Sequence, residues 1–322
     1  MVRRGVPLAG AVVLTLLALL AAGCGSFEDP TIVIDLRVLA MQADHPELVL
    51  DFDPEDPVAV VPQLDANPIT VSALVADPGA SRRLAWDMVA CPPTTDLRCD
   101  PADPSTAIGS GVVADPETAT DLPTGTFVVG LDVLDASVSA DSLAGFAGVA
   151  VQVQLRVWPE GGNADTDAVF ASKRLVIAPR VPAERVANKN PTLAALLVDK
   201  DVSQPMTPGR CEDPGAVRLE VEPEQEVVLL PVEPAGVRET YVLPTFDGGV
   251  RTITENLRYS WLATAGGWST GSSGGPIDAF GNVPTLDSTW TAPKDAGDVR
   301  LWLVQRDERG GLAWSEYCAR VR

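Results

Sequence analysis

Apolar and polar residues alternate along many short segments of this chain, and this period constrains the fold more than any other feature. From Val149 to Val157 every second residue is valine or leucine, and the residues between them are mostly polar. Successive side chains of a strand point to opposite faces, so this pattern predicts a strand with one buried face. The pattern recurs at Ile69–Val75, Leu84–Met88, Val217–Val221 and Leu257–Ala263.

Turn-forming residues separate the alternating segments. Asp77-Pro78-Gly79 and Asp247-Gly248-Gly249 are examples, and such residues favour tight turns. Short strands with frequent turns are typical of antiparallel β-sandwiches. The sequence therefore predicts an all-β protein, with one short helix around Ala140 to Ala147.

The first 23 residues have the organisation of an export signal. Arg3 and Arg4 precede an uncharged, largely apolar stretch that ends at Gly23. That stretch is nearly long enough to span a bilayer, so a transmembrane anchor is the alternative. The small residues Ala21-Ala22-Gly23 before Cys24 favour a cleaved signal peptide instead.

Residues 21–24 resemble the lipobox of bacterial lipoproteins. The resemblance implies that residues 1–23 are removed as a signal peptide and that lipid, including palmitate, is attached to Cys24. Residues 24–30 would then be a tether to the membrane. Gly25 after the cysteine, where Asp could stand, implies the outer membrane, with the protein facing the periplasm or the cell surface.

Charge excludes one class of partner. Loss of Arg3 and Arg4 with the signal leaves 22 basic and 44 acidic residues, a formal net charge of −22. Such a surface repels phosphate backbones, so nucleic acid is not an expected ligand. It also lacks a basic patch that would help to hold anionic lipid.

A segment near the middle lacks alternation and marks a boundary. Residues 179–189 contain two prolines and are locally basic, with Arg180, Arg185 and Lys189. Proline restricts its own backbone and that of the preceding residue, so a semi-rigid linker is expected there. We predict one domain over residues 31–178 and a second over residues 190–322.

The second domain resembles bacterial Ig-like domains of the polycystic-kidney-disease (PKD) type. The resemblance depends on Tyr259-Ser260-Trp261, on Trp290-Thr291-Ala292-Pro293 and on the Asp307 to Gly311 hairpin. The first domain, through Ile34–Ala40 and His45-Pro46-Glu47, is similar to the start of many bacterial lipoproteins of unknown function. The resemblance of the second domain implies a β-sandwich used in adhesion or as a spacer, whereas that of the first domain implies an Ig-like sandwich and no activity.

Four cysteines besides Cys24 form an even set, which in an exported chain indicates disulfides. A polar turn separates Cys91 from Cys99, so we predict a local bridge between them. We predict a second bridge from Cys211 to Cys318, tying the start of the second domain to its end.

Tryptophans concentrate in the second domain. Trp261 and Trp302 lie on apolar strands and are predicted core residues. Trp268 lies among Gly and Ser and is the candidate for contact with a ligand, because exposed aromatic rings stack on sugars. A carbohydrate-binding accessory protein is therefore the alternative function.

Acidic loops are the candidate sites for calcium, which binds several oxygen ligands. One such loop contains Asp51, Asp53, Glu55 and Asp56. Asn163, Asp165 and Asp167 imitate the start of an EF-hand loop, but Ala168 and Arg174 replace its required Gly and Glu.

Catalytic patterns do not emerge from the sequence. His45 is the single histidine, and Gly271–Gly275 is expected to be a mobile loop. We therefore expect no catalytic residue and no cofactor. The predicted function is that of a lipid-anchored, non-enzymatic structural, adhesive or binding module, with a glycan or a protein of the envelope as partner.

Overall fold

The computed structural model describes residues 29–51, 57–114, 116, 122–143, 145–146 and 148–322. The predicted signal peptide, Cys24 and the acidic residues Asp53, Glu55 and Asp56 lie outside the described residues. The described chain contains twenty strands and two short α-helices, so it is nearly all β, as the sequence predicts. None of its helices is long and apolar enough to cross a bilayer.

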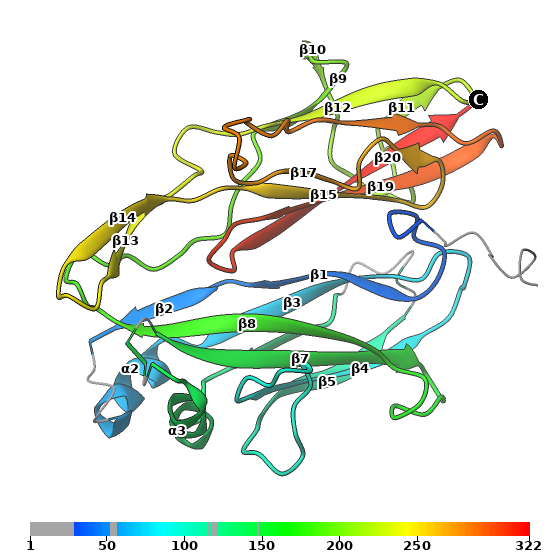
Figure 1. The fold of residues 1–322 in the computed structure, drawn as a ribbon. Helices are drawn as coiled ribbons and strands as arrows, with labels where there is room; N and C mark the ends of the chain where they lie inside the picture. The colour runs from blue at the N-terminus through cyan, green and yellow to red at the C-terminus, as the bar shows by residue number, and fades with distance from the viewer. Residues whose placement is uncertain (1–28, 52–56, 115, 117–121, 144, 147) are drawn as a thin grey trace, which may run out of the picture.

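Strands from the first half of the chain form one sandwich, drawn in blue to green in Figure 1. Its small sheet has the order β1 (Arg37–Ala43), β3 (Ile69–Ala76), β6 (Thr124–Phe127). Its large sheet has the order β2 (Glu47–Leu50), β8 (Val169–Pro179), β7 (Val149–Pro159), β4 (Leu84–Cys91), β5 (Thr106–Val113).

The helices lie beside the large sheet of this first sandwich (Figure 1). A 3-10 turn, η1 (Pro57–Val60), precedes α2 (Val61–Ala66), and α3 (Leu131–Ala140) packs against β7 and β4. The helix expected from Ala140 to Ala147 is therefore misplaced, because α3 ends where it was predicted to begin. Gly145 and Gly148 have φ angles of +79° and +109°, which turn the backbone out of a helix.

Strands from the second half form the other sandwich. One sheet has the order β10 (Asp201–Pro205), β9 (Ala195–Val198), β12 (Glu226–Val232), β18 (Ser288–Thr291), β16 (Gly267–Trp268). The facing sheet has the order β11 (Arg218–Val221), β20 (Leu312–Val321), β19 (Gly297–Arg306), β15 (Arg258–Ala263), β17 (Ser272–Gly274).

Two details of the second sandwich were not expected. A two-stranded hairpin, β13 (Thr240–Pro244) and β14 (Val250–Thr254), extends from it toward β2 and β8 (Figure 1). Residues 272–274, expected within a mobile loop, form β17 and pair with β15, so that expectation is wrong.

Most strand pairs are antiparallel, as predicted, but each sandwich also has a parallel pair. β2 runs parallel to β8, and β11 runs parallel to β20. In each parallel pair one strand, β2 or β11, lies at the edge of its sheet. Alternation in the sequence indicates a strand but not the direction of its neighbour.

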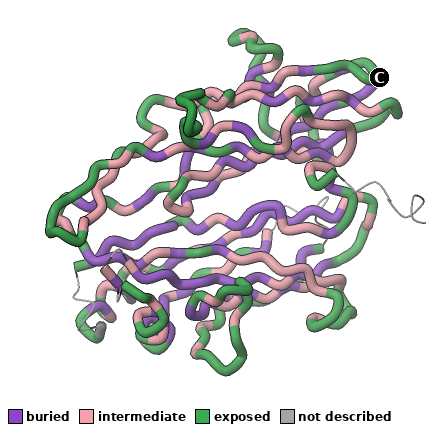
Figure 2. The backbone as a smooth tube through the Cα atoms, in the orientation of Figure 1, coloured by how far each residue is buried: buried purple, intermediate pink, exposed green. Residues whose placement is uncertain are grey.

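The two sandwiches share a third buried core. Each has its own core between its sheets. The third cluster joins the outer face of β1 and β3 to the outer face of β19 and β20, and comprises Val33, Leu39, Ala40, Leu74, Ala76, Trp302, Val304 and Leu312. The fold is thus four stacked sheets, and Figure 2 shows buried backbone in both halves where they meet.

Candidate functional site

The junction between the sandwiches contains a buried ion cluster centred on Glu47, which is 6% exposed. Its Oε1 accepts from Arg185 Nη2 at 2.8 Å, and its Oε2 accepts from Arg309 Nη2 at 2.6 Å. The backbone amide of Asn188 also donates to Oε2, at 2.9 Å. Glu47 belongs to β2, Arg309 to the turn between β19 and β20, and Arg185 to the connecting segment, so the cluster joins all three.

The connecting segment, residues 179–189, is more than the semi-rigid linker that the sequence predicts. Its basic residues each pair with a carboxylate: Arg180 with Asp51 at 2.8 Å, and Lys189 with Glu239 at 3.9 Å. Arg185 is buried against Glu47. The local excess of positive charge is therefore neutralised within the fold.

The hairpin β13–β14 contacts the same cluster. The Arg309 guanidinium lies 4.4 Å from the centre of the Tyr241 ring, a cation–π contact. A groove of about 220 Å³ lies here, lined by Glu47, Arg185, Tyr241, Leu243, Glu308 and Arg309. The hairpin thus extends the junction beyond the stacked sheets.

Lys173 and Asn190 add polar contacts at the junction. The Lys173 ammonium donates to the carbonyl of Gly310, and burial lowers the pKa of Lys173 to about 8. The Asn190 side chain donates to the carbonyl of Ala43 at 2.6 Å and accepts from the amide of Leu312 at 2.9 Å. These bonds fix the register between first-sandwich and second-sandwich strands.

Glu255 is a buried carboxyl beside the cluster and is 2% exposed. Its Oε1 accepts from the amide of Glu239 at 3.0 Å, and its Oε2 has no hydrogen-bond partner among the described residues. Burial is the main cause that raises the pKa of Glu255 to about 7, and the negative charge of Asp307 adds to it. The side chain is therefore suited to the neutral, protonated form.

We expect Glu255→Gln to stabilise the protein at pH 8 and to have little effect at pH 4.5. The folded state holds the Glu255 proton up to about pH 7, whereas the same carboxyl in the unfolded chain loses its proton near the ordinary glutamate pKa of 4.5. The stability contributed by Glu255 therefore falls as pH rises between these values and stays low above them. Melting temperatures of parent and variant across this range measure the effect. A difference that does not change with pH for Glu255→Gln would contradict the raised pKa.

Both predicted disulfide pairings occur in the structure. Cys91 is joined to Cys99 with a Cα–Cα distance of 5.7 Å, and Cys211 to Cys318 with a Cα–Cα distance of 5.0 Å. Cys318 lies in β20 between Tyr317 and Ala319, which belong to the second-sandwich core. Cys318 therefore points to the opposite face, which is the face toward the junction.

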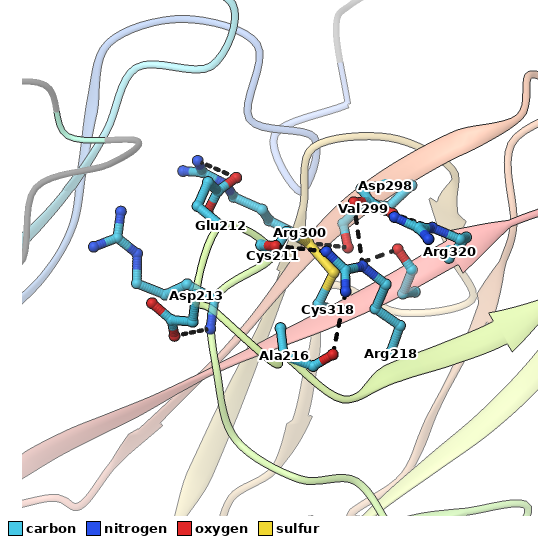
Figure 3. Close-up of a disulfide and its surroundings, with 12 residues drawn as sticks. Cys211, Glu212, Asp213, Ala216, Arg218, Asp298, Val299, Arg300, Cys318 and Arg320 are labelled. Atoms are coloured by element: carbon cyan, nitrogen blue, oxygen red, sulfur yellow. Dashed lines mark hydrogen bonds and ion pairs between the residues drawn. A yellow bond between two sulfur atoms is a disulfide. The ribbon is translucent and has the colours of Figure 1, made fainter.

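Arginine–carboxylate pairs surround the Cys211–Cys318 bridge (Figure 3). Arg218 donates to the carbonyl of Cys211 at 2.8 Å and pairs with Asp298 at 3.3 Å. Arg300 pairs with Glu212 at 2.6 Å. The bridge and these pairs hold the segment around Cys211 against the sheet.

That segment also reaches the first sandwich. The guanidinium of Arg210 donates to the carbonyl of Pro116 at 3.2 Å. The Trp302 indole donates to Glu316 at 3.0 Å on the same face of the sheet. The disulfide therefore anchors one end of the junction, while Glu47 and its arginines hold another part of it. Sequence reasoning predicted the bridge but not its place beside the other sandwich.

Trp268, the predicted ligand contact, is half-buried. Its ring centre lies 5.2 Å from that of Trp261, and its Nε1 is buried without a hydrogen-bond partner among the described residues. Trp261 and Trp302 are buried, as predicted, at 1% and 2% exposed. Contact between Trp268 and a ligand stays a prediction.

An exposed apolar loop follows β17. Ile277, Phe280 and Val283 are 60%, 91% and 75% exposed. The sequence signal for this loop was available, since three apolar residues recur at a spacing of three within a segment rich in Gly, Pro and Asn. We name residues 275–283 the apolar loop.

The acidic loops show no metal site in the described residues. No group of three or more His, Cys, Asp or Glu in that part of the chain could hold a metal ion. The Asp167 carboxylate accepts from the amide of Asn163 at 2.8 Å, and Asp165 pairs with Arg156 at 3.4 Å. Asp51, from the other loop, pairs with Arg180. His45 is exposed in the turn between β1 and β2.

The similarities to known proteins concern the fold alone. No protein-family model matches the chain, and no curated protein sequence matches it. The two tandem V-type regions of VCBP3, a v-region-containing chitin binding protein, share 9% identity over 88% of this chain and 100% of that one, with a TM-score of 0.26. The partial N-terminal region of enterococcal surface protein shares 8% identity over 94% of this chain and 99% of that one, with a TM-score of 0.24.

Other similar structures come from much longer chains. The chain spans 26% of a nucleoside hydrolase-related protein from Saccharophagus degradans, at 17% identity over 42% of this chain and a TM-score of 0.23. It spans 32% of red sea bream transglutaminase, at 10% identity over 90% of this chain and a TM-score of 0.24. All these TM-scores are below 0.5, so the likenesses carry no argument about function.

Proposed function

We propose that this protein is a lipid-anchored module of the bacterial cell envelope with a non-enzymatic structural or adhesive function. The lipobox-like residues before Cys24 support the anchor, and Gly25 after it supports the outer membrane. Two disulfides support an extracytoplasmic location, because such bridges persist in oxidising compartments.

The shared third core is the observation that carries the structural part of this proposal. Interfaces between domains of one chain are usually polar and permit relative motion. Here Trp302, Leu74 and Leu39 are buried between the sandwiches, and Glu47 is bonded to both Arg185 and Arg309. A molecule built in this way holds its surface loops in fixed relative positions, which suits a spacer or an adhesive module.

We expect Cys24→Ala to abolish the incorporation of labelled palmitate and to release the protein from the membrane fraction. The other four of the five cysteines pair in two disulfides, which leaves Cys24 as the candidate thiol for lipid. Metabolic labelling, followed by separation of inner and outer membranes, measures both effects.

The matched control is the double variant Cys91→Ser with Cys99→Ser, which removes two cysteines and should keep the label. Labelling of the Cys24→Ala protein would contradict the anchor. Labelled parent protein found only in the inner membrane would contradict the proposed location.

A further inference from the structure

We propose that the apolar loop, residues 275–283, inserts into the surface of the lipid bilayer to which the protein is anchored. This inference rests on the proposed lipid at Cys24. Phe280 is 91% exposed, and Ile277 and Val283 are 60% and 75% exposed. Large apolar side chains that cluster on an exposed surface mark sites of contact with proteins or membranes.

The loop is held in shape by its own hydrogen bonds. Asp278 Oδ1 accepts from the amides of Phe280 and Asn282, each at 2.8 Å, and Oδ2 accepts from the Asn282 side chain at 2.7 Å. The amide of Gly281 donates to the carbonyl of Asp278 at 3.0 Å, and Gly281 has a φ of +85°. The loop therefore presents its apolar side chains without a large cost of ordering.

The loop lies along the same sheet edge as the start of the described chain. Ile32 bridges to Ala263 of β15, and the amide of Ala263 donates to the carbonyl of Thr31 at 2.9 Å. β19 occupies the other side of β15, so residues 31–33 lie on the side of β17. Thr31 is also next to Gly271, where an added Cβ would lie 2.4 Å from Thr31 Cγ2.

The tether is short enough to bring this edge to the membrane. β15 separates the apolar loop from Thr31 by about 17 Å, at about 3.3 Å per residue. Four residues separate Cys24 from Asp29, so a fully extended tether spans at most about 17 Å. An anchor at Cys24 therefore keeps the apolar loop within reach of the bilayer, at a high effective concentration of lipid.

Charge selects the kind of bilayer. The mature chain has a formal net charge of −22, and hydrogen bonds from Asn282 lower the pKa of Asp278. The Asp278 carboxylate therefore remains ionised at the base of the loop, at the depth of the lipid head groups. Zwitterionic lipid accepts such a loop, whereas anionic lipid repels it.

The test uses the full lipidated chain in phosphatidylcholine vesicles, with an environment-sensitive fluorophore on Phe280→Cys. The native cysteines are in disulfides or, at Cys24, lipidated, so labelling is specific without reductant. The matched control is Phe246→Cys, since Phe246 is 81% exposed in the turn between β13 and β14. We expect a several-fold rise in emission at position 280 and quenching by lipid-borne quenchers, with neither effect at position 246. Replacing a third of the lipid by phosphatidylglycerol should reduce the rise.

Failure of insertion and failure of the anchor give different results. If the protein floats with vesicles but the label at 280 keeps its aqueous emission, the insertion is overturned and the anchor stands. A label that responds only when envelope proteins are added would also overturn it, in favour of a protein partner. If the protein does not float with the vesicles, the anchor is overturned. The insertion is then tested separately by adding concentrated vesicles to the soluble chain, and unchanged emission of the label at position 280 overturns it.

Discussion

Replacing both Cys211 and Cys318 by serine should lower the melting temperature under oxidising conditions by up to about 8 °C. The bridge closes a loop across 107 positions. In the chain-entropy model a bridge that closes such a loop destabilises the unfolded chain by up to about 4.7 kcal/mol. With an unfolding entropy of about 2.1 cal/mol/K per residue, each kcal/mol shifts the melting temperature of a chain of about 300 residues by about 1.6 °C. Loss of the bridge also frees the segment that carries Arg210 to the first sandwich.

Reductant and the shorter bridge provide the controls. With reductant present, the melting curves of parent and double variant should converge. The double variant of Cys91 and Cys99 should lose less, about 2.5 kcal/mol in the same model, because that bridge spans only 8 positions. A parent protein whose melting does not respond to reductant would show that the Cys211–Cys318 bridge contributes nothing to stability.

Glu47→Ala should destabilise the protein by about 3–5 kcal/mol, the range for breaking a buried ion pair from one side. The variant removes the carboxylate that the buried Arg185 and the half-buried Arg309 share, and it leaves the amide of Asn188 without its acceptor. Urea unfolding at neutral pH, followed by tryptophan fluorescence, measures the change in the free energy of unfolding.

Asp35→Ala is the matched control for this prediction. Asp35 also pairs with an arginine, Arg37, at 2.7 Å, but its side chain is 65% exposed. Exposed pairs of this kind contribute about 0–1 kcal/mol, so the control should stay within that range. Equal losses for Glu47→Ala and Asp35→Ala would contradict the role assigned to the buried cluster.

Strands with one buried face were predictable from the sequence. For strands that are buried on both faces, the sequence indicated the strand but not the burial of its second face. β15 follows the alternation closely. β7, for which the sequence predicts one buried face, is instead buried on both faces from Val149 to Leu155, including Gln152 and Gln154. In β19, Leu301 and Leu303 belong to the second-sandwich core, whereas Trp302 and Val304 belong to the third core. A period of two identifies a buried face only when the other face is polar, so the sequence indicated a core residue at Trp302 but not which core.

The ion cluster could not be predicted, because pairing depends on the fold rather than on local sequence. Arg185 and Glu47 are 138 positions apart, and Arg309 and Glu47 are 262 apart. Locally, Arg185 is one of several basic residues in a proline-containing segment. Only the return of β2 beside β8, and of the β19–β20 turn beside both, brings these side chains together.

The shared core also determines what can be exchanged between proteins of this kind. A single sandwich cut from this chain would expose either Leu39 and Leu74 or Trp302 and Val304 on an outer sheet face. Such an isolated half has an apolar face that favours aggregation. The pair of sandwiches, rather than either one, is therefore the smallest unit that can be transplanted into another protein by recombination or design.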